Sequence, residues 1–265
     1  LEDGSAMNQW FKAYCFLLYH RLRSIRQYPL DMVFGILGTV VWHLPNFLLI
    51  DIVFDRAQTI RVPKGYLLVL YGLSVFGDGV QHTFAEALWQ FGNVFVRSGA
   101  YDSVLTRPMP PLVQVLASRF DIDGMGGILW GLFCCLYGLR IADAVSLGAM
   151  TKLFLSLGVS ANVYLSINIL TSSLAFVAVD NFPVTHTVFQ LHSFGRFPMT
   201  IYPRWARTLL TLAVPVFCAT YYPAAEIFSR GYLGALFLFM LSILMLVLGI
   251  FTWQSLSKIY KSTGA

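Results

Sequence analysis

Long apolar stretches cover most of this chain and constrain its fold more than any other feature of the sequence. Hydrophobic residues make up 57% of the chain and charged residues 12%, against roughly 45–50% and about 25% in soluble domains. A soluble globule of 265 residues could not hide so much apolar surface, whereas a bilayer replaces water as the solvent. The composition therefore predicts an all-α integral membrane protein that crosses the bilayer several times.

Six of these stretches are predicted to cross the membrane, since a crossing needs about 20 mostly apolar residues. The fourth is longer than a simple crossing requires, so it is expected to be tilted or to extend beyond the bilayer. The fifth is short and contains Pro215 and Pro223. Its end, Tyr221-Tyr-Pro-Ala-Ala-Glu226, predicts a broken or re-entrant element, which requires cover from protein or water. The predicted spans are 30–54, 66–90, 113–139, 147–179, 206–222 and 231–253.

The N-terminal residues predict a helix that lies in the headgroup plane. Leu1 to Ala6 are interpreted as a tag remnant and Met7 as the native start, with no cleavable signal peptide after it. Residues 7–265 are interpreted as one transmembrane domain. An aromatic-rich face opposite a basic face is typical of an interfacial helix, and Pro29 is expected to end it. The apolar face carries Trp10, Phe11, Tyr14, Leu18, Leu22 and Ile25, and the polar face carries Lys12, His20, Arg23 and Gln27.

The distribution of lysine and arginine places both termini in the cytoplasm, because these residues are enriched in cytoplasmic loops. Lys152 falls inside a predicted span, and the external group Arg56, Arg61 and Lys64 has no explanation in the sequence. One side collects twelve basic residues: Lys12, Arg21, Arg23, Arg26, Arg97, Arg107, Arg119, Arg196, Arg204, Arg207, Lys258 and Lys261. The other side collects five: Arg56, Arg61, Lys64, Arg140 and Arg230.

The sequence lacks the common motifs of catalysis and nucleotide binding. It contains no G-x-x-x-x-G-K-[ST], no H-E-x-x-H and no G-x-S-x-G, so it has no phosphate-binding loop of that type and no recognisable catalytic nucleophile. Cys15, Cys134, Cys135 and Cys218 lack the spacing of metal ligands. We therefore expect neither a metal nor a cofactor on this chain.

A stripe of polar residues follows one face of the second predicted span. Asp78, His82, Glu86 and Gln90 recur every four residues. Ionisable groups at membrane depth usually face a bundle interior or a wet cavity. The stripe is either a polar lane along a translocation path or a set of contacts to a neighbouring helix. For Glu86 and Gln90, contacts to a neighbouring helix are the favoured interpretation. Small polar residues of the fourth span are interpreted as helix-packing residues: Ser156, Ser160, Asn162, Ser166, Asn168, Thr171, Ser172 and Ser173.

A short polar insert, residues 95–111, separates the second and third predicted spans. Gly99 and the prolines at 108, 110 and 111 punctuate it, and Tyr101 to Leu105 can form one helical turn. A short, stiff, charged element on the cytoplasmic side suits the transmission of force from a soluble partner. An ordinary solvated loop is the alternative.

The pattern of the insert resembles a known family. Arg97 to Pro108, read as R-S-G-x-Y-D-x-x-L-x-R-P, resembles the cytoplasmic coupling segment after the second span of type 2 ABC transporter permeases. Phe197-Pro-Met-Thr-Ile-Tyr-Pro203, Pro215 and Tyr221-Tyr-Pro-Ala224 are also similar to a bacterial branch of that family. The resemblance extends over nearly the whole chain. It implies that the residues contacting the ATPase are Arg97, Gly99, Asp102, Leu105, Arg107 and Pro108.

The resemblance also implies the setting in which the protein works. The expected assembly is an exporter in the bacterial inner membrane, with two permease chains, identical or related, and two ATPase subunits. ATP and magnesium would bind the ATPase subunits, so this chain alone would be no enzyme. Membrane lipids are expected partners and nucleic acid is not. The family shares no substrate-binding motif, so the cargo stays open.

Two other functions are compatible with the polar residues. An ion-coupled secondary transporter would use Asp31, Asp78 or Glu86 as a relay for protons or ions. An integral-membrane enzyme would use His82 and Glu86 in its chemistry. Neither explains why the most strongly patterned polar segment is a loop between two spans.

Overall fold

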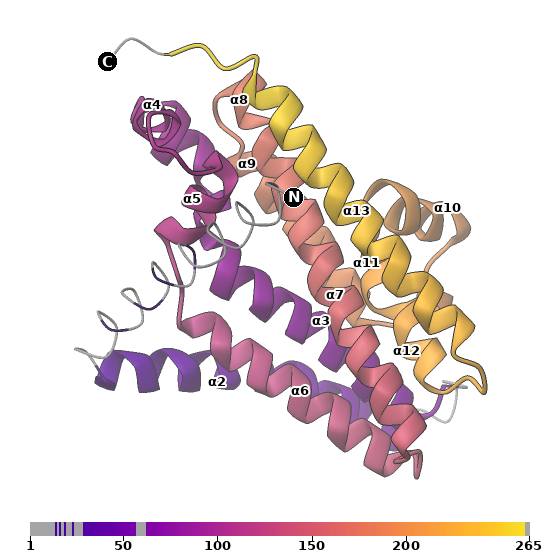
Figure 1. Cartoon of the computed structure of the whole chain (residues 1–265). Helices are drawn as coiled ribbons and strands as arrows, with labels where there is room; N and C mark the ends of the chain where they lie inside the picture. Colours follow the sequence, from indigo (N-terminus) through magenta and orange to yellow (C-terminus); the bar gives the residue numbers. More distant parts are fainter. Residues whose placement is uncertain are drawn as a thin grey trace.

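The computed structural model describes Tyr14, Phe16, Tyr19, Arg23 and residues 29–56 and 62–262. These residues form helices and connecting turns, without a strand among them. The prediction of an all-α chain is therefore confirmed for the described residues. The principal helices, shown in Figure 1, are α2 (Pro29–Arg56), α3 (Lys64–Ala85), α4 (Ala100–Leu105), α5 (Pro111–Ser118), α6 (Asp123–Ile141), α7 (Leu147–Ser173), α8 (Ala175–Ala178), α9 (Phe182–His192), α10 (Arg204–Thr208), α11 (Val216–Ala219), α12 (Tyr221–Ile227) and α13 (Leu233–Ser257).

Among the described residues, four helical segments are long and apolar enough to cross a membrane. A fifth arises if the bent pair Arg204–Ala213 and Val216–Ile227 is taken as one crossing. The four segments are Pro29–Ile50, Asp123–Ile141, Leu147–Ala178 and Leu233–Ser257. They agree closely with the predicted first, fourth and sixth spans and with most of the third.

Helix α3, the second predicted span, does not belong to that set. Its C-terminal half carries Asp78, Gln81 and His82, which lower its apolar content. Other helices enclose the remainder of α3, in which Leu68, Val69 and Leu70 are fully buried. Because other helices rather than lipid surround it, α3 tolerates polar side chains that a lipid-exposed helix would not. The count of six spans stays a prediction.

Helices α3 and α6 pack backbone against backbone along their length (Figure 1). A Cβ atom added at Gly72 would lie 2.6 Å from the carbonyl oxygen of Gly131, and one added at Gly79 would lie 2.8 Å from that of Gly124. Glycine on both helices therefore permits this close approach. The three antiparallel pairs, which recur every seven residues, are Gly65 with Gly138, Gly72 with Gly131 and Gly79 with Gly124. We call this contact the glycine seam.

Of two predicted spans, one ends early and the other is interrupted, because the chain turns at polar residues. Helix α3 ends at Ala85, not at residue 90. The predicted third span, 113–139, is wrong as one continuous helix, because α5 ends at Ser118 and α6 begins at Asp123. Between them, the backbone N–H of Asp121 donates to the carbonyl oxygen of Thr83 at 3.2 Å. The turn thus satisfies an otherwise unpaired carbonyl at the end of α3.

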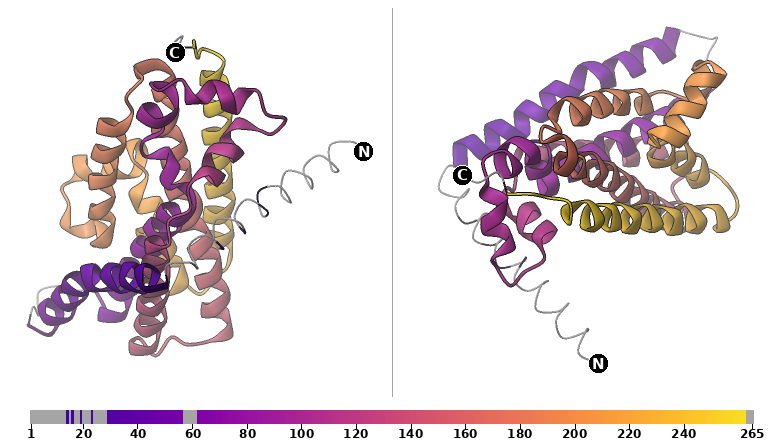
Figure 2. Two further views of the ribbon diagram at one scale, coloured as in Figure 1. Left: turned by 90° about the vertical axis from the view of Figure 1, so that its left-hand side faces the viewer. Right: turned by 90° about the horizontal axis from the view of Figure 1, so that it is seen from above.

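The predicted break near the fifth span is confirmed, with one correction. The helix pair bends by 70° at Val214 and Pro215, where proline cannot continue the hydrogen-bond pattern. Pro223 does not interrupt the helix, since it lies in the first turn of α12, where a missing N–H costs nothing. Helix α9, which precedes the bent pair, was not predicted. Figure 2 shows the bent segment packed beside the longer helices.

The polar side chains of α7 bind neighbouring elements, as predicted for packing residues. Ser160 Oγ donates to the Leu73 carbonyl oxygen at 2.7 Å, and Asn168 Nδ2 donates to that of Ala85 at 3.2 Å. Asn162 Nδ2 donates to Ser242 Oγ on α13 at 3.2 Å. Others bond within α7, among them Ser166 to the Asn162 carbonyl. The interhelical bonds place α7 at the centre, between α3 and α13.

Two interpretations involve residues that the structure does not describe. The interfacial helix predicted between Trp10 and Ile25 includes only Tyr14, Phe16, Tyr19 and Arg23 of the described set. Of the external basic group, Arg61 is not described. Both interpretations stay predictions.

Candidate functional site

The polar insert contains a helical turn, as its sequence predicted. Helix α4 begins after Gly99, which has a φ angle of 73°, a left-handed conformation that glycine adopts without steric cost. Ser98 Oγ donates to the Val94 carbonyl at 2.6 Å and accepts the Ala100 N–H at 3.2 Å. The turn is therefore held on both sides of Gly99.

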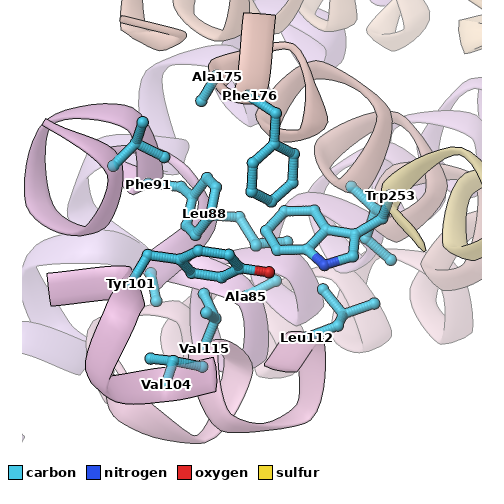
Figure 3. Packing of buried hydrophobic residues seen from close by; sticks show 13 residues of the cluster. Ala85, Leu88, Phe91, Tyr101, Val104, Leu112, Val115, Ala175, Phe176 and Trp253 are labelled. Carbon is cyan, nitrogen blue, oxygen red and sulfur yellow. The ribbon is translucent and has the colours of Figure 1, made fainter. Parts of the chain in front are cut away.

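Tyr101 anchors α4 to the body of the protein (Figure 3). Its side chain is fully buried, with its ring 5.5 Å from that of Phe91 and 5.2 Å from that of Phe176. Trp253 of α13 closes the cluster, 4.5 Å from Phe91. Burial raises the pKa of Tyr101 to about 12, so the phenol is neutral at physiological pH. This aromatic cluster joins α4 to α8 and α13.

Asn181 holds the segment that enters the insert. This fully buried side chain accepts the Gly92 N–H through Oδ1 at 2.7 Å and donates through Nδ2 to the Leu88 carbonyl at 3.1 Å. Gly92 begins a π-helical turn, Gly92–Val96, that leads to Arg97. Asn181 was not predicted as a site residue, because an asparagine after an apolar run carries no distinctive pattern.

On the opposite face of the insert, the described side chains are not packed into the body of the protein. Arg97, Leu105, Arg107 and Pro108 are exposed, and Gly99 and Asp102 are half-buried. Leu105 exposes 51% of its surface, so it presents an apolar group beside exposed arginines. Asp102 Oδ2 accepts a hydrogen bond from Ser262 Oγ at 2.6 Å. The structure thus brings all six predicted contact residues onto one short element, α4 and its flanks.

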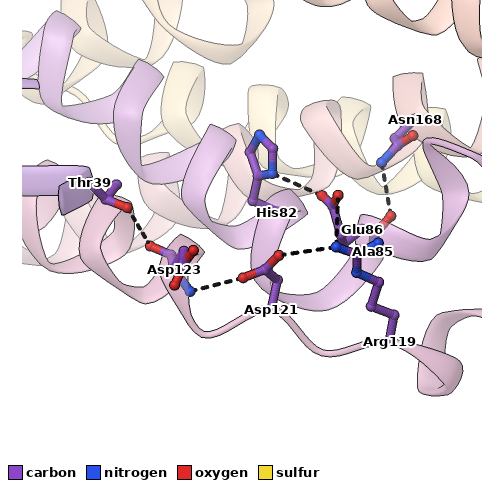
Figure 4. Close-up of polar contacts among 8 residues, drawn as sticks. All are labelled: Thr39, His82, Ala85, Glu86, Arg119, Asp121, Asp123 and Asn168. Atoms are coloured by element: carbon purple, nitrogen blue, oxygen red, sulfur yellow. Dashed lines mark hydrogen bonds and ion pairs between the residues drawn. The ribbon is translucent and has the colours of Figure 1, made fainter. Parts of the chain in front are cut away.

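A second polar feature is a cleft between α2, α3 and α6 with a volume of about 320 Å³. Asp78, His82 and Glu86 line it, so the predicted stripe is one continuous face up to the end of α3. Figure 4 shows the acidic side chains at its lower edge, where Asp121 and Asp123 join the stripe from the start of α6. Gln90 lies outside this cleft and lines another with Arg119, because the chain turns after Ala85.

Hydrogen bonds and ion pairs connect the charged residues of the cleft (Figure 4). His82 Nδ1 lies 2.9 Å from Glu86 Oε2. Arg119 Nη2 lies 4.0 Å from Glu86 Oε1 and 3.8 Å from Asp121 Oδ2. Asp121 Oδ1 accepts the Asp123 N–H at 3.0 Å. Acidic groups nevertheless outnumber the cations, which leaves the cleft negative.

Asp121 and Asp123 were not predicted to belong to the cleft. Both lie in what was predicted as the interior of the third span, and the Asp-Ile-Asp pattern is the one signal that could have indicated a helix start there. Thr39 of α2 donates to the Asp123 carbonyl at 3.0 Å and so closes the far wall. No group of three or more His, Cys, Asp or Glu side chains in the described part of the chain is arranged to hold a metal ion.

Comparison with protein families gives one match. A family model described as ABC-2 family transporter protein matches residues 40–264. The matched region contains both the insert with α4 and the polar cleft. Neither the curated proteins nor the solved structures gave a match.

Proposed function

The chain belongs to the ABC-2 family of transporter proteins, and from this premise we propose that it is the membrane subunit of an ATP-driven exporter. Permeases of this family are membrane components of ABC transporters and are not themselves catalytic. Two permease chains, identical or related, would enclose the path of the cargo. Separate ATPase subunits would bind ATP and magnesium and supply the energy.

The observation that carries the proposal is the two-sided character of α4. Tyr101 and Val104, three residues apart, are buried in the aromatic cluster. Leu105 and Arg107 point away from it and are exposed. A surface with an apolar centre and arginine neighbours has the composition of a protein contact. This arrangement favours docking of a soluble subunit over the alternative of an ordinary solvated loop.

The path by which movement of α4 would reach the membrane follows from its connections. The chain enters the insert from α3 and leaves it through α5 to α6. The aromatic cluster adds a contact from Tyr101 to Phe176, which in turn contacts Trp253. A displacement of α4 by the ATPase would therefore be conveyed to α3 and α6 along the chain and to α7, α8 and α13 through side chains.

Charge reversal at Arg107 tests the proposal. We expect Arg107→Glu to abolish copurification of the ATPase while expression and membrane insertion stay normal, because the exposed side chain has no packing role. The matched control is Arg204→Glu, an exposed arginine on the same predicted side but outside the insert. Normal ATPase association in Arg107→Glu, or equal loss in both variants, would remove α4 from the docking role.

We further propose that the acidic cleft lies on the translocation path. Its polar lining at the end of α3 supports this role. The same carboxylates favour a second candidate, ion-coupled secondary transport, in which Asp78 or Glu86 relays protons. The two differ in their energy source. Transport that stops on ATP depletion and survives collapse of the ion gradient supports the exporter, and the reverse result supports ion coupling.

A further inference from the structure

A buried lysine at the end of the molecule remote from α4 has no role in the proposed coupling. Lys152 lies in α7, where the sequence placed it inside a span, and it is only 5% exposed. Its ammonium group donates to the carbonyl oxygen of Ser229 and lies 5.3 Å from the centre of the Tyr232 ring. In the described part of the chain, Lys152 forms no ion pair. It therefore carries a buried charge without a counter-charge.

Such a charge is costly to bury unless something neutralises it. A carbonyl dipole and an aromatic face attract a cation, but removal of an unpaired ion from water costs several kcal/mol. The nearest carboxylate in the contact network, Glu226, accepts a hydrogen bond from Ser229 Oγ at 3.0 Å and does not pair with Lys152. Glu226 is therefore linked to the lysine through Ser229 but forms no direct ion pair with it.

The lysine lines an open cavity with a volume of about 350 Å³. Arg230, whose side chain is exposed, adds a second cation to the lining. The first turn of α7 contributes Gly148 and Ala149. Ser146 Oγ already accepts the Ala149 N–H at 3.1 Å, but the start of a 27-residue helix still favours negative charge through its dipole. Figure 1 places the start of α7 and the connection from α12 to α13 side by side, consistent with the Lys152 to Ser229 contact.

We propose that this cavity binds an anionic phosphate group. An arginine fork at the rim, a lysine point charge in the interior and a helix start are the groups with which proteins hold phosphate oxygens. The cavity is large enough for a phosphate ester as well as for the free ion. The structural alternative, in which Lys152 only caps the end of α12 through Ser229, uses one of three ammonium N–H donors and leaves the buried lysine without an anion.

Phosphate could come from a phospholipid headgroup or from solution, and thermal unfolding of the purified full chain distinguishes them. Tryptophan fluorescence would follow the transition in micelles with phosphatidylglycerol or phosphatidylcholine, and separately with inorganic phosphate or chloride at equal ionic strength. A bound ligand stabilises the folded state, so we expect Tm to rise by at least about 2 °C with a phosphate-bearing anion. A rise with phosphatidylglycerol alone identifies the lipid, and a rise with inorganic phosphate identifies the soluble ion.

Variants show whether the rise comes from this cavity. Lys152→Met and Arg230→Gln should lose the rise in Tm. Arg140→Gln should retain the rise, because Arg140 is an exposed cation of α6 that does not line the cavity. Since Arg230 is exposed, its variant decides the question even if Lys152→Met does not fold. No rise with either probe, or a rise that Arg230→Gln retains in full, would overturn the proposal. The result does not depend on whether the chain is an exporter.

Discussion

Asp78, like Asp123, carries a carboxylate of the cleft that has no hydrogen-bond partner among the described residues. Glu86, by contrast, pairs with His82 and Arg119. An unpaired carboxylate inside a bundle is costly, so it is retained for function more readily than for packing. This contrast favours a transport role for Asp78, for which the sequence left both interpretations open, and a structural role for Glu86, which the sequence already favoured.

We therefore predict that Asp78→Asn alters transport and leaves assembly with the ATPase unchanged. Asparagine keeps the size of the side chain and removes its charge. The measurement is uptake into inverted vesicles alongside copurification of the ATPase. Asp143→Asn is the matched control, since Asp143 is exposed and asparagine tolerates its φ of 48°. Failure of Asp78→Asn to assemble would instead make the residue part of the packing.

Tyr101 shows how one side chain can hold a whole element. Its hydroxyl is buried without a hydrogen-bond partner in the described residues, so the ring, not the hydroxyl, supplies the anchoring. We predict that Tyr101→Phe leaves stability unchanged or slightly higher, because it removes an unsatisfied polar group. Tyr101→Ala should cost about 3 kcal/mol through the cavity it leaves.

Hydrogen exchange would show which residues become less stable in Tyr101→Ala. In Tyr101→Ala, we expect faster exchange at Ala100 to Leu105 and little change in α6. Equal exchange in the alanine and phenylalanine variants would mean that the aromatic cluster does not hold α4. The phenylalanine variant also serves as the control for any effect of substitution at this position.

At the scale of elements, the glycine seam predicts that alanine has opposite effects on Tm at two glycine positions. A Cβ atom at Gly131 would lie 2.5 Å from the backbone nitrogen of Phe76, whereas one at Gly38 of α2 meets nothing within 4 Å. Alanine raises helix propensity by up to about 1 kcal/mol over glycine. Gly38→Ala should therefore raise Tm slightly, and Gly131→Ala should lower it because two backbones must separate, at a cost of about 1–3 kcal/mol. A similar Tm change in both variants would contradict the seam.

The number of crossings is a question for the whole molecule. If α3 crosses the membrane, Pro63 at its start and Thr106 after α4 lie on opposite sides. Both are exposed. We predict that Pro63→Cys reacts with an impermeant thiol reagent in intact cells, and that Thr106→Cys reacts only after permeabilisation. The parent chain controls for native thiols, of which Cys134 and Cys135 are buried. Labelling of both positions from the same side would reduce the count of crossings.

The sequence predicted most long helices, because apolar runs report directly on membrane-length segments. It predicted the turn of α4 and the break at Pro215, since glycine and proline act locally. It did not predict the turn between Ser118 and Asp123, where an aspartate pair starts a helix inside an apolar run. It also missed the glycine seam, although both helices repeat glycine every seven residues, because a repeat on one helix does not identify its partner. The clustering of Asp121 and Asp123 with Asp78 depends on that packing.

The glycine seam also determines how the antiparallel helix pair α3 and α6, called the hairpin below, can move. Each glycine faces a backbone group of the other helix, so sliding by a single residue would bring a larger side chain against that backbone. The pair is locked in register and can tilt only as one lever, with α4 near its tip and the acidic cleft along its arm. A push at the tip would thus change the width of the cleft without any rearrangement inside the hairpin.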